Sequence, residues 1–571
     1  MLPSTAIHER SWRRTASTGL IWGGVAAFVS VAGMVMTFAE REIVAGIVSM
    51  GHALLFLTSL AAGYQAARRS AGGALITLGH GALAGMASGA VLAALAVLAH
   101  LVNLRPVLIN ASPELFALLT FGRGAAGAGL LPAVGAALGA ASAVAVLLPP
   151  AGRRPLFAGL AWILFLGMFQ ELLQLSLLTG SVGGAIGEWL YSASGLLPRG
   201  ALTVFAVAAG ANLVWARRGA AVRGRLQQWS PGRRRGLRLA AFALITAGLL
   251  LVPAAGGPFL SQVMVLVGLF AVLGLGLNIV VGFAGLLDLG YVAFFAIGAY
   301  TMGLLTSTGE HGLAQMSFWA AVPIAMVVSM IAGVLLGIPV LKIRGDYLAI
   351  ATLGFGEIIR LLVLSDFLRP WLGGSQGVLA IPKPAIGGFE FAGPEQLFYL
   401  VLASAALVML VATRLRDSRL GRAWMAVRED EDVAEATGIN LVNVKLLAFG
   451  LGAFFGGLSG AVFAVMLGSV FPHSFQLLIS INVLALIIVG GMGSLPGVVV
   501  GSLALVGLPE LLREFAEFRF LVYGAALVVM MQWRPEGLWP EPVRKRELRW
   551  STPEEEVEAT APAMEAGERP A

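Results

Sequence analysis

Long apolar runs alternate with short charged segments along most of the chain. An apolar run of about 18 to 25 residues is long enough to cross the hydrocarbon core of a bilayer as a helix. In the first part of the chain such runs lie near residues 18–39, 43–64, 74–101, 127–148, 156–178 and 200–216. In the second part they lie near 239–254, 259–281, 286–306, 317–339, 346–364, 396–413, 444–467, 476–494, 496–512 and 518–533. The pattern predicts an all-α polytopic membrane protein, with a block of about six spans followed by a core of about ten.

Basic residues follow alternate runs. In the first part, arginine pairs come after the second, fourth and sixth run, at 68–69, 153–154 and 217–218. In the second part, basic residues come after the fourth, sixth and tenth run, at 342–344, 414–445 and 544–546, whereas the loops 307–316 and 470–475 contain no Lys or Arg. Because cytoplasmic loops carry an excess of Lys and Arg, this spacing predicts that both termini are cytoplasmic. The net charge of +7 therefore reports orientation, and we expect no nucleic acid partner.

A basic segment rich in Pro and Gly separates the two groups of runs, as linkers between domains do. We expect an N-terminal membrane block of unknown role at 1–217 and a basic cytoplasmic linker at 218–238. A second membrane domain would then occupy 239–540. The remaining tail, 541–571, is acidic and rich in Pro and Ala, and we expect it to be disordered.

The composition excludes several kinds of chemistry. The 571 residues are 58% hydrophobic and 12% charged, and they include no cysteine, which excludes thiol catalysis and cysteine-ligated metals. No Lys follows a Gly, so the chain lacks a Walker A loop for binding ATP. The six histidines are scattered without the spacing of metal ligands. We therefore expect no catalytic residue, no metal and no cofactor.

The loop at 414–445 is the most charged part of the second domain, with six basic and six acidic residues. It cannot lie in hydrocarbon, where a central charge costs about 2.5–3.5 kcal/mol. The acidic run from Glu429 to Asp432 favours a helix start, because the helix dipole attracts negative charge to the first turn. Val433 and Ala436 would give this helix a small apolar face, and Gly438 is a natural stop. The loop is either the contact for a soluble partner or a merely solvated connection.

Three glycine-rich stretches, 274–305, 342–362 and 483–501, interrupt apolar runs of the second domain. Repeated glycines permit the discontinuous helices that transporters use to line a pathway. Our candidates for the translocation pathway lie in or beside these stretches, and they are Asn278, Asp288, Gly290, Tyr291, Glu357 and Asn482. Asp288 either lines the route or caps a helix, and Glu357 either faces a water-filled path or pairs with Arg360. The two asparagines contact either a neighbouring helix or the substrate.

The second domain closely resembles the permease subunit of branched-chain amino acid ABC importers. The residues that carry the resemblance are Leu277-Asn278 with GFAGLLDLGYVAFFAIGAY, LKIRGDYLAIATLGFGEIIRLL, DSRLGRAWMAVREDEDVAEATGIN and GGMGSLPG. Two features depart from the family pattern. The loop 373–377 reads GGSQG and lacks the usual Asn, and the N-terminal block exceeds the short extension typical of relatives.

The resemblance implies a function and a set of partners. The chain would form the pathway for leucine, isoleucine and valine in the bacterial cytoplasmic (inner) membrane. Its partners would be a second homologous permease, two cytoplasmic ABC ATPase subunits and a periplasmic or tethered substrate-binding protein. The family's loop inserts a coupling helix into the ATPase, and the residues that match it here are Glu429, Asp430, Asp432, Val433, Glu435, Ala436 and Gly438.

Three other functions stay open at this point. Permeases for urea or short amides are similar in the same segments. An ion-coupled secondary transporter would need carboxylates or cation sites at the midplane, and this sequence has very few. A membrane enzyme could use the polar stripe Gln170, Glu171 and Gln174, but it would lack clustered His or Cys residues.

Overall fold

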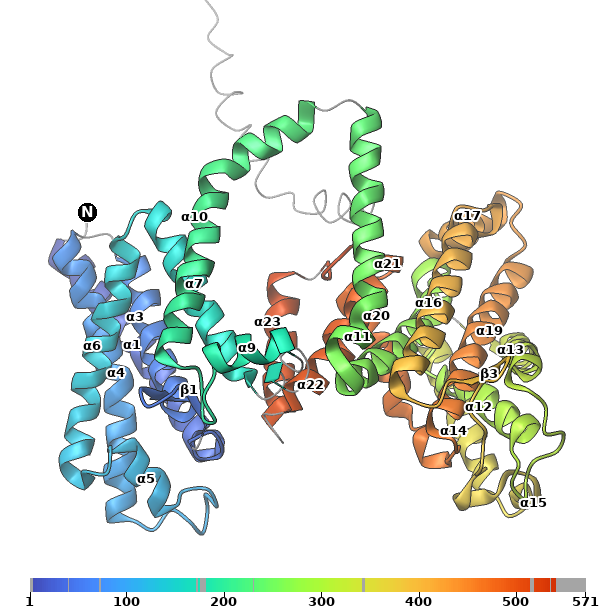
Figure 1. Ribbon diagram of the computed structural model, residues 1–571, viewed down its shortest axis with the longest axis horizontal. Helices are drawn as coiled ribbons and strands as arrows, with labels where there is room; N and C mark the ends of the chain where they lie inside the picture. Colours follow the sequence, from blue (N-terminus) through green and yellow to red (C-terminus); the bar gives the residue numbers. More distant parts are fainter. Residues whose placement is uncertain are drawn as a thin grey trace, which may run out of the picture. The chain divides into compact units, whose positions relative to one another are not determined.

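The computed structural model describes residues 4–39, 41–70, 73–170, 173–174, 181–228, 231–340, 343, 345–513, 518–534 and 536–540. The chain divides into two units, Met1–Ile245 and Thr246–Ala571, which are described separately below (Figure 1). Within the described residues, nine helices are long and apolar enough to cross a membrane, and two further apolar helices are shorter. The prediction of an all-α polytopic membrane protein is therefore confirmed.

The first unit is a group of helices with one short hairpin. Its elements are α1 (Ser4–Val31), α2 (Met34–Thr37), β1 (Glu42–Val44), β2 (Val48–Ser49), α3 (Met50–Arg69), α4 (Ala74–Leu101), α5 (Pro113–Leu119), α6 (Gly124–Leu147), α7 (Pro150–Met168), α9 (Ser181–Leu190) and α10 (Pro198–Gln228). Ser112 caps α5, whose seven residues are too few to span a membrane. In the predicted polar stripe, the Gln170 side chain donates a hydrogen bond to the Ser192 carbonyl, whereas Glu171 lies outside the described residues.

Helix α11 (Pro231–Asn278) leads into the second unit and is broken at Gly257, where φ is 66° and ψ is −169°. Only glycine adopts this backbone conformation readily, and Pro253 and Pro258 flank it. The break separates the two runs that the sequence predicts at 239–254 and 259–281. The remaining elements are η1 (Ile279–Phe283), α12 (Val292–Thr306), α13 (Phe318–Val340), α14 (Asp346–Leu364), α15 (Arg369–Leu372), η2 (Gly374–Gln376), β3 (Ala385–Ile386), β4 (Phe389–Glu390), α16 (Pro394–Arg416), α17 (Arg419–Glu429), α18 (Glu431–Ala436), α19 (Leu441–Leu467), η3 (Pro472–Ser474), α20 (Leu477–Gly490), α21 (Leu495–Ser502), η4 (Leu503–Gly507), α22 (Leu508–Leu511) and α23 (Arg519–Trp533).

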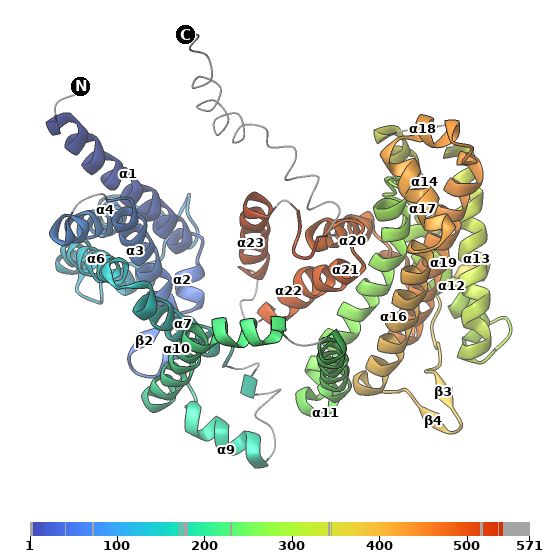
Figure 2. The same cartoon turned by 90° about the horizontal axis from the view of Figure 1, so that it is seen from above.

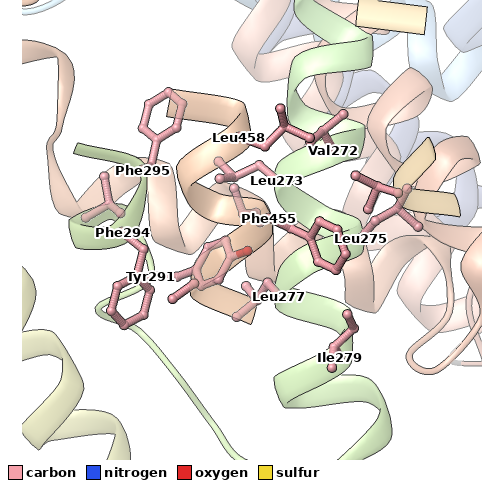
Figure 3. Packing of buried hydrophobic residues seen from close by; sticks show 14 of the residues in the cluster. Val272, Leu273, Leu275, Leu277, Ile279, Tyr291, Phe294, Phe295, Phe455 and Leu458 are labelled. Carbon is pink, nitrogen blue, oxygen red and sulfur yellow. The ribbon is translucent and has the colours of Figure 1, made fainter. Parts of the chain in front are cut away.

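The core of the second unit lies where α11, α12 and α19 meet. Side chains from all three helices form one buried cluster, which includes Leu277, Tyr291 and Phe455 (Figure 3). Figure 2 shows α17 and α18 at one end of this bundle and the β3–β4 hairpin at the other. The charged loop thus occupies one end of a tightly packed apolar unit.

Candidate functional site

Helix α17 rests on the second unit through one buried face. Ser418 caps its start by accepting a hydrogen bond from the Gly421 backbone N–H. Trp424 and Val427 are buried, and the Trp424 indole Nε1 donates to the Val444 carbonyl at 2.8 Å. A buried indole N–H with an acceptor fixes the orientation of the side chain. Helix α17 is therefore held against the start of α19.

The predicted acidic helix exists but begins two residues later than expected. Glu429 is the last residue of α17, and α18 runs from Glu431 to Ala436. The reason is Asp430, whose side chain accepts from the backbone N–H groups of Asp432 and Val433 and so acts as the N-cap. Gly438 lies beyond the helix end with φ of 90°, a conformation that favours glycine.

The outer face of α18 is free to receive another molecule as far as the described residues show. Val433 is 59% exposed, and Glu435 and Ala436 are exposed as well. Ala434 is buried and packs toward the bundle. The small helix thus presents acidic groups around a single exposed valine.

An ion pair ties α18 to α19. Lys445 Nζ lies 2.6 Å from Glu431 Oε1, and the two side chains are only 5% and 21% exposed. Removing one partner of such a pair leaves a poorly solvated charge, which is strongly destabilising. The pair therefore holds α18 against the start of α19.

Arg428 connects the loop to η1, the π-helical turn that follows α11. Its Nη1 donates to the Gly282 carbonyl at 2.8 Å, and its Nη2 donates to Glu429 Oε1 at 2.8 Å. The backbone of Gly285, which has φ of 71°, lies directly against the Arg428 side chain. The guanidinium thus satisfies a carbonyl of the π-helical turn η1, where the regular helix pattern is lost.

The turn η1 is held on its other side by Asn278. The Asn278 side chain is fully buried, and its Oδ1 accepts from the Gly493 backbone N–H at 3.0 Å. Gly493 belongs to the glycine-rich connection between α20 and α21. This hydrogen bond therefore joins two of the glycine-rich stretches in which discontinuous helices are predicted, 274–305 and 483–501.

Asp288, Gly290 and Tyr291 follow in the irregular segment before α12. Asp288 Oδ1 accepts from the Gly290 N–H at 2.9 Å, and the Tyr291 hydroxyl donates to the Gly452 carbonyl at 2.7 Å. A Cβ at Gly290 would collide with the Thr352 carbonyl, so this position requires glycine. Among the described residues, neither Asn278 Nδ2 nor Asp288 Oδ2 has a hydrogen-bond partner, although both atoms are buried. Such unsatisfied groups are unusual in a folded core.

The other two pathway candidates, Glu357 and Asn482, lie on helices α14 and α20. Glu357 and Arg360 form an ion pair on α14, with side chains that are 42% and 27% exposed. Asn482 is exposed on α20. Asn278 thus lies beside η1, and Asp288, Gly290 and Tyr291 lie in the irregular segment before α12. Glu357 and Asn482 lie on α14 and α20, two helices that contact this segment through Thr352 and Ser480.

The sequence pattern did not identify Trp424, Arg428 or Lys445 as functional candidates. Leu420, Trp424 and Val427 recur at helical spacing, which could have identified the buried face of α17. Nothing in the local pattern distinguishes Arg428 from the other arginines of the loop, because its acceptor lies 146 residues away.

Comparison with known proteins points to one family. The family described as branched-chain amino acid transport system / permease component matches residues 259–531. The high-affinity branched-chain amino acid transport system permease protein LivM of Salmonella typhimurium is 42% identical over 319 residues, covering 51% of this chain and 73% of the relative. LivH of Escherichia coli, a permease protein of the same kind of system, is 24% identical over 294 residues, covering 48% and 92%.

An archaeal relative is also similar. The probable branched-chain amino acid transport permease protein LivM of Methanocaldococcus jannaschii is 23% identical over 330 residues, covering 49% of this chain and 93% of the relative. No solved structure gives a significant match. The family match at 259–531 falls within the second unit.

Proposed function

Because the chain belongs to the family of branched-chain amino acid transport permeases, we propose that it forms the translocation pathway of an ATP-driven importer of leucine, isoleucine and valine. The observation that carries this proposal is the 42% identity to LivM, which extends over 73% of that permease. The chain is a multi-pass membrane protein of a family of transport permeases. The energy would come from separate ATPase subunits, since the sequence has no Gly-Lys pair for a Walker A loop.

The ATPase contact is α18 with its flanking residues. The side chains proposed for it are Glu429, Asp430, Asp432, Val433, Glu435 and Ala436, with Gly438 closing the helix. Exposure of Val433 and the acidic groups around it supports this role, because a soluble partner can reach them. The other proposed partners are a second homologous permease, two ABC ATPase subunits and a periplasmic or tethered binding protein.

Movement of α18 would reach the pathway through two connections. The Lys445–Glu431 pair passes it to α19, and Arg428 passes it to η1 through the Gly282 carbonyl. From η1 the Asn278–Gly493 hydrogen bond leads to the connection between α20 and α21. ATP binding and hydrolysis would thereby shift the bundle between two packings that open to opposite sides of the membrane.

The pathway itself is proposed to involve the irregular segment around Asp288 and Tyr291, together with Glu357 and Asn482. The buried, unsatisfied Asn278 Nδ2 and Asp288 Oδ2 support this, since a second packing of the segment could give them partners. We also propose that both termini are cytoplasmic and that residues 1–217 form a separate membrane block.

Uptake by the reconstituted complex tests this function. The chain is placed in proteoliposomes with the proposed permease, ATPase and binding-protein partners, and uptake of leucine and of urea is measured with and without ATP. We expect ATP-dependent leucine uptake. Uptake of urea instead would assign the permease to urea or short amides, and ion-driven uptake by the chain alone would reject an ABC mechanism.

A further inference from the structure

A cavity of about 250 Å³ lies in the second unit, away from the site described above. It is lined by the first turns of α16, the last turn of α19 and the part of α11 just after Gly257. Helix α19 begins beside α18 and runs for 27 residues to this cavity, a length of about 40 Å at the rise of an α-helix. The cavity is therefore at the end of the bundle opposite α18, beside the β3–β4 hairpin (Figure 2).

Three charged side chains line this cavity, in a unit whose core is strongly apolar. Lys383 Nζ donates to the carbonyls of Val465 and Met466 at 2.8 and 2.7 Å, which holds its ammonium group at the end of α19. An ammonium group has three N–H donors, so one remains for a further acceptor. Glu510 and Arg513 complete the set.

Glu510 and Arg513 are paired only loosely. Arg513 Nη1 lies 3.9 Å from Glu510 Oε1, whereas charge-assisted hydrogen bonds have lengths of about 2.7–2.9 Å. The buried pair Lys445–Glu431 in the same unit is much closer, at 2.6 Å. Both groups at the cavity therefore retain the capacity to bind a charged ligand.

The remaining walls are mainly aliphatic. Val263 and Leu397 are buried, and Leu266 is half-buried. Apolar walls with a few convergent polar groups are the usual composition of a small-molecule site. These walls suit a ligand with an aliphatic side chain. The basic residues Lys383 and Arg513 suit a carboxylate on that ligand, and the acidic Glu510 suits an ammonium group.

We propose that this cavity binds an aliphatic amino acid as its zwitterion, on the side of the membrane where substrate arrives. The carboxylate contacts Lys383 and Arg513, the ammonium group contacts Glu510, and the side chain lies against Val263, Leu266 and Leu397. This proposal deepens the proposed function and rests on it, since the opposite end of the bundle carries the ATPase contact.

Binding of tritiated leucine to the purified full chain in lipid nanodiscs tests the site directly. Two leucine analogues serve as competitors: 4-methylpentanoate lacks the ammonium group, and isopentylamine lacks the carboxylate. Their competition shows which charged group of leucine the site recognises. We expect leucine to compete at least about tenfold better than either analogue, because each analogue leaves a charged group unpaired. Glu510→Gln should weaken leucine binding about tenfold and abolish the discrimination against 4-methylpentanoate. Arg513→Gln should also weaken leucine binding about tenfold, and it should reduce the discrimination against isopentylamine, because Lys383 remains as the second cation for the carboxylate.

The pair Arg369–Asp366 supplies matched controls. It has the same i,i+3 spacing and the same 3.9 Å separation, and it does not line the cavity. Asp366→Asn and Arg369→Gln should bind leucine like the wild type. Leu266→Trp should block binding by filling the cavity, and monodisperse elution of each variant shows that it is folded.

Three results would overturn the site. The first is wild-type leucine binding in both Glu510→Gln and Arg513→Gln, and the second is equal loss in the control variants. Absence of leucine binding by the wild-type chain also rejects it, even if the complete complex imports leucine with ATP. The proposed function fails separately, if the complex does not import leucine at all.

Discussion

Arg428 donates a hydrogen bond of 2.8 Å to the carbonyl of Gly282, and the two residues lie 146 positions apart in the chain. The contact joins the last turn of α17, directly before α18, to η1, the π-helical turn that follows α11. The charged loop is thus bonded to the backbone of an irregular segment of the second unit. This relationship connects the proposed ATPase contact with the proposed pathway.

Arg428→Gln should uncouple ATP hydrolysis from transport, so that ATP is hydrolysed with less leucine taken up. The amide cannot replace both donors of the guanidinium, and hydrogen bonds to charged groups contribute about 1.5–3 kcal/mol. We expect leucine uptake per ATP hydrolysed to fall about tenfold in proteoliposomes, with ATPase activity retained. Arg419→Gln is the control, because Arg419 is an exposed arginine at the start of the same helix. An unchanged uptake-to-ATP ratio in Arg428→Gln would show that the link does not transmit motion.

Lys445→Met should destabilise the fold. It leaves Glu431 with a partly buried charge, and breaking a buried pair costs about 3–5 kcal/mol. We expect a clearly lower Tm for the purified chain, measured by differential scanning fluorimetry in detergent. Lys445→Met with Glu431→Met should recover much of the loss, since two apolar groups replace the pair. A double variant no more stable than the single one would contradict this explanation.

Glu435→Lys and Gly438→Asp should each disrupt the ATPase contact. The first reverses a charge on the exposed face of α18, and the second places a side chain where φ is 90°. We expect at least about a tenfold loss of ATP-driven uptake, because like charges or a displaced helix end weaken the interface. The quantity of protein in the membrane should stay at the wild-type level. Glu395→Lys in the first turn of α16 is the charge control, and uptake at the wild-type level in both loop variants would remove α18 from the interface.

Asn278→Ala should loosen the junction between η1 and the α20–α21 connection. It leaves the buried Gly493 N–H without its acceptor, which costs about 1–3 kcal/mol. We expect a lower Tm and faster proteolysis of the connection around Gly493. Asn482→Ala, at an exposed position, should have little effect on either measurement. Equal Tm values for Asn278→Ala and the wild type would mean that the junction is not held by this bond.

Apolar helices of both units were predictable because the length and the period of an apolar run are local properties of the sequence. The run at 74–101 coincides with α4, and the acidic loop contains the short helix expected of it. The start of α18 was missed because Asp430 caps the helix instead of lying inside it. The contacts of Arg428 and Asn278 join residues 146 and 215 positions apart, so no local pattern identifies them. The charge cluster at the cavity was missed for the same reason, since Lys383 and Glu510 come from distant segments.

Cysteine labelling at Val433 tests whether α18 faces the cytoplasm and contacts the ATPase there. The natural chain has no cysteine, so Val433→Cys introduces a single thiol, at a position that is 59% exposed. We expect a membrane-impermeant maleimide to label this thiol in inverted vesicles but not in spheroplasts, and we expect added ATPase subunits to protect it. Labelling from the outside of spheroplasts would exclude the proposed contact, because α18 could then not meet a cytoplasmic ATPase.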